Sequence, residues 1–181
     1  MDKSLNFIFR RRSIRKYLET PVEPEKIDFL LQAGMAAPSA MNTKPWEFVV
    51  VTDADRLAAL RKATPYSGYQ VPVVIAVCGN LGLTHNPTRR LFWVQDCSAA
   101  TENILLAASE LGLATVWIGI HPISQFKNAV RKALQLPASV IPLSLIYIGY
   151  PAVEKESRSQ YDPTRIHWDT FGNQPHLEDK A

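Results

Sequence analysis

The residues best suited to chemistry stand near the start of the chain, in the stretch RRRSIRKY. Five of the seven positions from Arg10 to Lys16 are basic, and Ser13 lies among them. The planar guanidinium of arginine binds phosphate through two parallel hydrogen bonds, and a serine hydroxyl adds a short, directed one. The stretch is therefore suited to holding a phosphate group. It is equally typical of a solvated basic helix end, which the helix dipole favours.

The distribution of charge argues against a nucleic-acid footprint. The 181 residues carry a net charge of +3. Without the five basic residues of 10–16, 15 Lys and Arg remain against 17 Asp and Glu, and the net charge becomes −2. Proteins that follow a nucleic-acid backbone more often spread Lys and Arg along a face. The basic excess is local, so an RNA-binding or nuclear-localisation patch is disfavoured.

Two further stretches offer groups that could reach a ligand. APSAMNTKPW places Ser39, Asn42 and Lys44 in a loop between two prolines. GLATVWIGIHP places Gly119 just past an expected strand, where a glycine lets backbone N–H groups approach a flat ligand. Both stretches also have an ordinary interpretation, the first as turn residues and the second as a strand-to-loop glycine.

No set of side chains indicates catalysis by the protein alone. The chain has no G-x-S-x-G elbow and no Walker A loop. Gly79 and Gly82 follow a strand but lack the third glycine of a dinucleotide-binding turn. The four histidines show no metal-ligand spacing, and the two cysteines form no C-x-x-C. We therefore expect the chemistry to belong to a bound cofactor and expect no metal site.

Composition and cysteine usage predict a cytoplasmic, globular protein. Apolar residues make up 46% and charged residues 20% of the chain, which is enough to build a core. Cys78 and Cys97 lie in apolar surroundings, which favours a reducing compartment. No apolar run approaches the roughly 20 residues that span a bilayer, and the charged start does not continue into the apolar segment of a signal peptide.

Periodicity and turn residues predict the elements that position these groups. Helices are expected over 4–12 with a Ser4 cap, 22–37, 53–63, about 88–113 and 122–137. Strands are expected over 46–52, 71–79, 113–120 and 140–152. We predict a single α+β domain over residues 1–181, in which the residues from about 151 form a C-terminal tail that lies on the surface of a partner subunit.

The helix expected over about 88–113 is apolar on most of its circumference. One stripe consists of Trp93, Cys97, Ala100, Ile104, Ala108 and Leu111. Further apolar residues, among them Ala99 and Leu106, widen that surface well past the stripe. Such a helix is buried on most of its surface, and in a domain of this size that predicts a subunit interface as well as a core.

The order of these segments resembles the nitroreductase family, whose members are FMN-dependent homodimeric oxidoreductases. The resemblance rests on RRSIRKY, PSAMNTKPW, the helix containing Trp93–Asp96, LGLATVWIGI and IPLSLIYIGYPA. It runs from about Phe7 to Trp168, nearly the whole chain. The resemblance implies a central mixed or antiparallel sheet flanked by helices, with the long buried helix at a homodimer interface.

The resemblance also implies roles for particular residues. One wall of an FMN site would consist of Arg11, Arg12, Ser13 and Arg15, with Arg11 toward the phosphate and Arg15 toward the pyrimidine side of the ring. The second subunit would contribute Ser39, Ala40, Met41 and Asn42. Gly119 and Ile120 would supply N–H donors near the flavin N5 and O4. For the C-terminal phosphate-binding cation the first choice is Arg165 and the second is Arg158, while Arg10 and Lys16 are expected to be solvated.

The implied activity is a ping-pong reaction in which NADH or NADPH delivers hydride to FMN and a nitroaromatic, quinone or similar acceptor is then reduced. The protein would provide no acid or base of its own. Lys44 stands where family members often have Gln, and the chain is short, which predicts an open substrate pocket. The alternative is a flavin-binding carrier or sensor without turnover. Phe126 and Trp117 could stack on a substrate, but core packing is the favoured interpretation for both.

Overall fold

The computed structural model describes residues 6–83 and 85–174 of the chain. Its centre is an antiparallel sheet in the order β1-β2-β4-β3. The strands are β1 (Trp46–Val51), β2 (Val73–Asn80), β4 (Val140–Gly149) and β3 (Ala114–Gly119). A parallel bridge outside these strands joins Ser13 to Thr115. The predicted α+β fold is confirmed, and all paired strands of the sheet are antiparallel.

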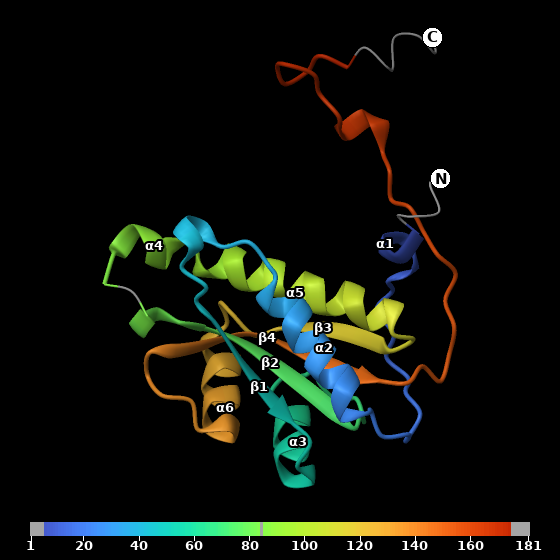
Figure 1. The fold of residues 1–181 in the computed structure, drawn as a ribbon, viewed down its shortest axis with the longest axis vertical. Coiled ribbons are helices and arrows are strands. Elements are labelled where there is room, and N and C mark those ends of the chain that lie inside the picture. Colours follow the sequence, from blue (N-terminus) through green and yellow to red (C-terminus); the bar gives the residue numbers. More distant parts are fainter. Residues whose placement is uncertain (1–5, 84, 175–181) are drawn as a thin grey trace.

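Helices cover both faces of this sheet (Figure 1). On one face lie α2 (Pro24–Met35) and α5 (Trp93–Glu110), and on the other lie α3 (Ala54–Arg61) and α6 (Ser124–Leu134). The central strand β2 is apolar from Val73 to Cys78 because this part faces a core on each side. Its side chains alternate between the two cores, as Ile75 packs toward α5 and Ala76 toward the opposite face.

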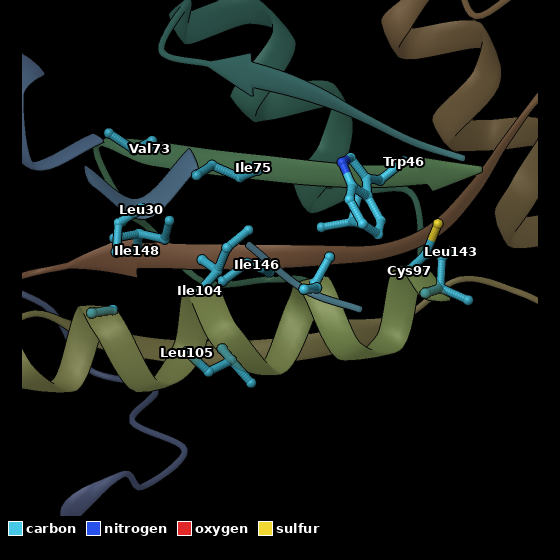
Figure 2. Packing of buried hydrophobic residues seen from close by; sticks show 14 of the residues in the cluster. Leu30, Trp46, Val73, Ile75, Cys97, Ile104, Leu105, Leu143, Ile146 and Ile148 are labelled. Carbon is cyan, nitrogen blue, oxygen red and sulfur yellow. The ribbon is translucent and has the colours of Figure 1, made fainter. Parts of the chain in front are cut away.

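The core beneath α5 fixes that helix against the sheet (Figure 2). Ile104 of α5 is fully buried together with Leu30 of α2 and Ile146 of β4. The two helices approach closely at Gly34, where an added Cβ would lie 3.0 Å from the Ile104 Cδ1. Truncating a residue such as Ile104 to Ala would cost about 2–5 kcal/mol of stability. The helix that carries the candidate site is thus firmly seated.

The helix predicted over about 88–113 is interrupted. It consists of α4 (Pro87–Leu91) and α5, which meet at the half-exposed Phe92. Five members of the predicted stripe, from Trp93 to Ala108, are buried, and Leu111 packs at the edge of the core. On the other side of α5, Ala99, Leu106 and Ala107 are only partly covered, which leaves an apolar surface available.

The start of the described chain and part of the C-terminal tail run beside each other near one end of α5 (Figure 1). The helix α1 (Asn6–Arg10) begins the described chain, so the predicted Ser4 cap lies outside the described residues. Residues 151–174 form an extended tail with one short turn, η4 (Pro163–Arg165). The tail first runs along residues 9–16 and, beyond Arg158, leads away from the body. None of the described helices is both long and apolar enough to cross a membrane.

Candidate functional site

The basic segment, residues 10–16, is held in place by its backbone. The Ile14 N–H donates to the Thr115 carbonyl of β3 at 2.9 Å. The Ile14 side chain is buried, and the Tyr17 hydroxyl donates to the Ile14 carbonyl at 2.6 Å. In extended chain successive side chains point to opposite sides, so Ser13 and Arg15 face away from the core. Arg15 is exposed, as a ligand-binding cation must be.

Three cations of this segment, Arg10, Arg11 and Arg12, already have partners. The Arg11 Nε lies 3.2 Å from the Glu102 carboxylate on α5, and Arg10 pairs with Glu110 at the end of that helix. Burial raises the pKa of Glu102, while the nearby Arg11 acts in the opposite direction. Arg12 donates to the Glu156 carbonyl of the tail. These partners are exposed or half-exposed, so an anionic ligand could exchange for them.

The tail brings a different cation to this segment from the one that the sequence predicts. Lys155 donates from Nζ to the Ser13 carbonyl at 2.9 Å, and its side chain lines a groove of about 440 Å³ together with those of Arg11 and Arg12. Arg158 lies close by, since its N–H donates to the Phe9 carbonyl at 3.2 Å. Arg165 lies in the turn η4, in the part of the tail that leads away from α1 (Figure 1). The Arg165 side chain is 84% exposed and pairs with Asp162.

The loop of the second predicted stretch has an unusual backbone. Met41, Asn42 and Lys44 all have φ near +50°, in the left-handed region that residues with a Cβ rarely adopt. Local bonds support the turn: the Ser39 Oγ accepts from the Lys44 N–H at 2.9 Å, and the Thr43 hydroxyl donates to the Ala40 carbonyl at 2.6 Å. Several such residues in a short loop are typical of a functional site.

Asp96 connects this loop to α5. One carboxylate oxygen of Asp96 accepts from the Ala40 N–H at 2.9 Å. The side chain is buried, and its other oxygen has no hydrogen-bond partner among the described residues. Asp96 lies in the first turn of α5, where the helix dipole stabilises a carboxylate. The sequence offered one signal for this role, an acidic residue three positions after Trp93 on the buried face of the helix.

The third predicted stretch ends β3 with an open glycine. A Cβ added to Gly119 would meet no atom within 4 Å, so a flat ligand could approach the backbone there. Ile120 is fully buried, and its N–H donates to the Leu143 carbonyl at 2.9 Å. Within one chain the Ile120 N–H, predicted as a donor to the flavin, is therefore already engaged. Trp117 and Phe126 pack against the two cores, in agreement with the favoured interpretation of both.

Within one chain, the predicted site residues contact different parts of α5. Arg10 and Arg11 pair with its C-terminal half, and the Ser39–Asn42 loop lies by its N-terminal turn, next to α4 (Figure 1). At that turn the ring of Trp93 meets the ring of His121, which follows Gly119 and Ile120, at 4.9 Å. Burial lowers the pKa of His121, and Lys127 adds to this. Among the described residues, no group of three His, Cys, Asp or Glu side chains is placed to hold a metal ion.

Comparisons with known proteins agree on one family. Residues 8–67 and 64–150 match the nitroreductase family. A protein of Methanothermobacter thermautotrophicus, provisionally named NADH dehydrogenase/NAD(P)H nitroreductase, is 44% identical over 165 residues, which cover 90% of this chain and 85% of that protein. A provisionally named NADH dehydrogenase/NAD(P)H nitroreductase structure from Bacteroides thetaiotaomicron has 41% identity and a TM-score of 0.87, covering 94% of this chain and 99% of that one. A provisionally named nitroreductase of Desulfovibrio desulfuricans, solved in complex with FMN, has 30% identity and a TM-score of 0.79, with 94% of this chain and 99% of that one covered.

Proposed function

The chain belongs to the nitroreductase family, and from this premise we propose that it is an FMN-dependent oxidoreductase that uses NADH or NADPH. The observation that carries the proposal is the cluster of Arg11, Arg12, Ser13 and Lys155 along the start of β3. Such a cluster suits the phosphate of FMN, because guanidinium and ammonium groups form charge-assisted hydrogen bonds to phosphate oxygens. Bound FMN supplies hydride transfer between the nicotinamide and an acceptor.

The residues of the chain have binding and orienting roles in this proposal. Arg11 and Arg12 would hold the phosphate, exchanging their present partners for it. Arg15, exposed on the same segment, would place a cation beside the pyrimidine side of the ring and stabilise negative charge there. Gly119 would leave room for the flat ring, with the neighbouring buried Ile120 fixing the end of β3. For the cation of the tail, the contacts within one chain favour Lys155 or Arg158 over Arg165.

We further propose that the working form is a homodimer in which Ser39, Ala40, Met41 and Asn42 reach the cofactor held by the other subunit. The proposal is supported by the separation of this loop from the basic segment within one chain. It is also supported by apolar surface that one chain leaves uncovered. Phe29 and Met35 on α2 are more than half exposed, and in the tail Phe171 is 92% exposed. The tail was predicted to lie on the partner from about residue 151, but its first part bonds to residues 9–16 of its own chain, so the part beyond Arg158 would pack on the partner subunit.

The acceptor proposed is a nitroaromatic, a quinone or a similar small molecule, reduced in a ping-pong sequence. Donor and acceptor would occupy one open place in turn. No side chain is assigned as acid or base, so the contribution of the chain is to position the reactants and exclude water.

Absorbance and steady-state kinetics test the proposal. The purified chain should bind FMN with the flavin band near ~450 nm, and should oxidise NADH or NADPH when a quinone or nitroaromatic is present. Parallel double-reciprocal plots would support the ping-pong order. The mass in solution should be twice the 20.3 kDa of one chain. A chain that does not bind FMN contradicts the whole proposal, and FMN binding without turnover with either donor would favour a flavin carrier or sensor.

A further inference from the structure

We propose that Asp96 is a positioning residue that keeps the Ser39–Lys44 loop in the conformation required for cofactor binding. This inference rests on the proposed function, because it takes the loop to be part of the FMN site. Asp96 is buried behind the loop, so it would act through the Ala40 backbone and would not touch the cofactor.

The first argument is that the loop needs an external support. Three of its residues, Met41, Asn42 and Lys44, have left-handed backbone angles, which the Cβ of each disfavours. The hydrogen bonds within the loop shape its turns, as the Asn42 N–H donates to the Ser39 carbonyl at 3.0 Å. Such local bonds do not fix the position of the turn relative to the rest of the molecule.

The second argument is that Asp96 provides this support. Its bond to the Ala40 N–H, at 2.9 Å, connects the residue just before Met41 to α5. The far end of the loop is held separately, since the Asn80 N–H of β2 donates to the Pro45 carbonyl at 2.7 Å. The acceptor is a carboxylate, and hydrogen bonds to charged acceptors are the stronger kind. The bond is part-buried, with the Asp96 side chain 5% exposed, and this limits competition with water.

The third argument is the firm base on which Asp96 stands. One turn earlier on α5, Trp93 lies against the backbone of β2 so closely that a Cβ on Gly79 would come within 2.2 Å of the Trp93 ring. Cys97, the next residue after Asp96, is fully buried in the same core. The first turn of α5 therefore cannot shift to follow the loop, and the carboxylate sets where the loop lies.

The unpartnered oxygen of Asp96 points to the same role. A buried acceptor without a donor is unfavourable, and such atoms are rare in folded proteins. A residue that served only to fill the core would be better as an apolar side chain. The position instead carries a carboxylate with one oxygen on Ala40 and the other without a partner among the described residues, which indicates that the contact to the loop is what the position requires.

Two substitutions and a matched control test the inference. Asp96→Asn keeps an oxygen that accepts from the Ala40 N–H, and Asp96→Ala removes it. Asp53→Ala is the control, because Asp53 also accepts a backbone N–H at 2.9 Å, from Arg56 at the start of α3, away from the loop. All are made in the full chain. The measurements are the Kd for FMN and the hydrogen-exchange rate of the Ala40 amide.

We expect Asp96→Ala to raise the Kd for FMN by about ten- to a hundredfold, the loss associated with one charge-assisted hydrogen bond. Asp96→Asn should raise the Kd by less than about tenfold, because it keeps an accepting oxygen but not its charge, and Asp53→Ala should lower the melting temperature without changing the Kd. The Ala40 amide should be protected from exchange in the parent and in Asp96→Asn, and should exchange faster in Asp96→Ala. Equal FMN affinity in Asp96→Ala and the parent would overturn the inference, as would equal losses in Asp96→Ala and Asp53→Ala.

Other outcomes separate this inference from the proposed function. If the parent protein does not bind FMN, the proposed function fails, and the Ala40 exchange rates still test the contact itself. If Asp96→Ala does not fold, Asp96→Asn decides: an unprotected Ala40 amide in that folded variant would overturn the inference. A loss of FMN affinity in Asp96→Asn as large as in Asp96→Ala would also overturn it, because the charge and not the accepting oxygen would then matter.

A second pair of variants tests the strain directly. Asparagine tolerates the left-handed region better than most residues do, so Lys44→Asn should make the loop less dependent on Asp96. Lys44→Gln removes the same charge without that preference. The increase in Kd caused by Asp96→Ala should be smaller in the Lys44→Asn background than in the Lys44→Gln background. Equal increases would show that strain at Lys44 is not what Asp96 opposes.

Discussion

The two halves of helix α5 hold their acidic residues in different ways: in exposed ion pairs toward the C-terminus and, buried, in a hydrogen bond at the N-terminus. Toward its C-terminus, Glu102 and Glu110 pair with arginines, and the acidic side chains are 45% and 62% exposed. At its N-terminus, Asp96 is 5% exposed and, among the described residues, accepts one backbone N–H, that of Ala40. Exposed ion pairs contribute about 0–1 kcal/mol, whereas a hydrogen bond to a buried charged group contributes about 1.5–3 kcal/mol.

The difference separates groups that can change partners from groups that cannot. At the C-terminal end the Ile14–Thr115 backbone bond fixes the chain, so the arginines can give up weak ion pairs for a phosphate. At the N-terminal end a side chain fixes the backbone, and losing that contact would release the loop. Ligand-binding strength should therefore depend on the arginines directly and on Asp96 indirectly.

The largest effect that tests this contrast is expected for Arg12→Ala. Removing a guanidinium that binds phosphate should raise the Kd for FMN by about ten- to a hundredfold, and the remaining affinity should depend less on salt than that of the parent. Titration of the apoprotein with FMN, followed by fluorescence quenching, gives both quantities. Lys16→Ala is the control, since Lys16 is an exposed cation of the same segment that is expected to be solvated. Equal losses in the two variants would mean that general charge, and not Arg12, holds the ligand.

At the other end of α5, the corresponding test is Gly79→Ala. The new Cβ would meet the Trp93 ring at 2.2 Å, and overpacking of this kind costs about 1–3 kcal/mol. Thermal denaturation should show the loss. Gly68→Ala is the matched control, because an added Cβ there meets no atom within 4 Å, and its melting temperature should barely change. A Gly79→Ala protein as stable as the parent would show that the N-terminal turn of α5 is loosely packed.

The sequence predicted the basic residues near the C-terminal half of α5 better than it predicted the contact of the buried Asp96 at the N-terminal turn. Charge is visible in the residue types, and the basic excess of residues 10–16 stands out in any count. The strands could also be predicted, because short runs of apolar, β-branched residues bounded by turn residues, such as that of β2, are typical of strands in a sheet covered on both faces. The interruption at Phe92 was missed, since an apolar residue without a neighbouring Gly or Pro gives no signal of a helix break.

The contacts that were missed depend on how distant segments meet. Lys155 lies at Ser13 because the Ala152 N–H donates to the Lys16 carbonyl at 3.0 Å, and this sets how the tail lies along the basic segment. No spacing in the sequence encodes that register. Asp96 has the same difficulty. An acidic residue in the first turn of a helix is commonplace, and only the arrival of the Ala40 backbone gives it a further role.

A smaller effect is expected from pH at the exposed end. Burial raises the pKa of Glu102 above its usual value, so the folded protein binds this proton more tightly than the unfolded chain does. The stability that Glu102 contributes therefore falls as pH rises from its ordinary value through the raised one. Glu102→Gln does not titrate, and its stability relative to the parent should increase from about pH 4 to about pH 7.

The change should stay below about 1 kcal/mol, because solvent screens a half-exposed carboxyl. Melting temperatures of both proteins across this pH range provide the measurement. Glu110→Gln serves as the comparison, since Glu110 belongs to the more exposed pair with Arg10. If the stability of Glu102→Gln relative to the parent falls with rising pH, the Arg11 ion pair outweighs burial. Arg11 would then give up Glu102 for a phosphate less readily than the exposure of the pair indicates.

The smallest expected signal is an absence of reaction at the buried end. Cys97 follows Asp96 and donates to the Cys78 carbonyl at 3.5 Å. Burial raises the pKa of Cys78 to about 12 and that of Cys97 further still. Because the thiolate is the reactive form, neither thiol should react with a disulfide reagent at about pH 8 while the protein is folded.

The two thiols belong to cores on opposite faces of the sheet, so they report on the two faces separately. A Ser139→Cys variant supplies an exposed thiol as the positive control. Reaction of Cys97 alone, at a rate faster than global unfolding, would mean that the first turn of α5 opens locally. Asp96 would then stand on a mobile base, and its contact with Ala40 could not determine where the loop lies. Protection of both thiols in the presence and absence of FMN would instead show that the first turn of α5 is rigid before any cofactor binds.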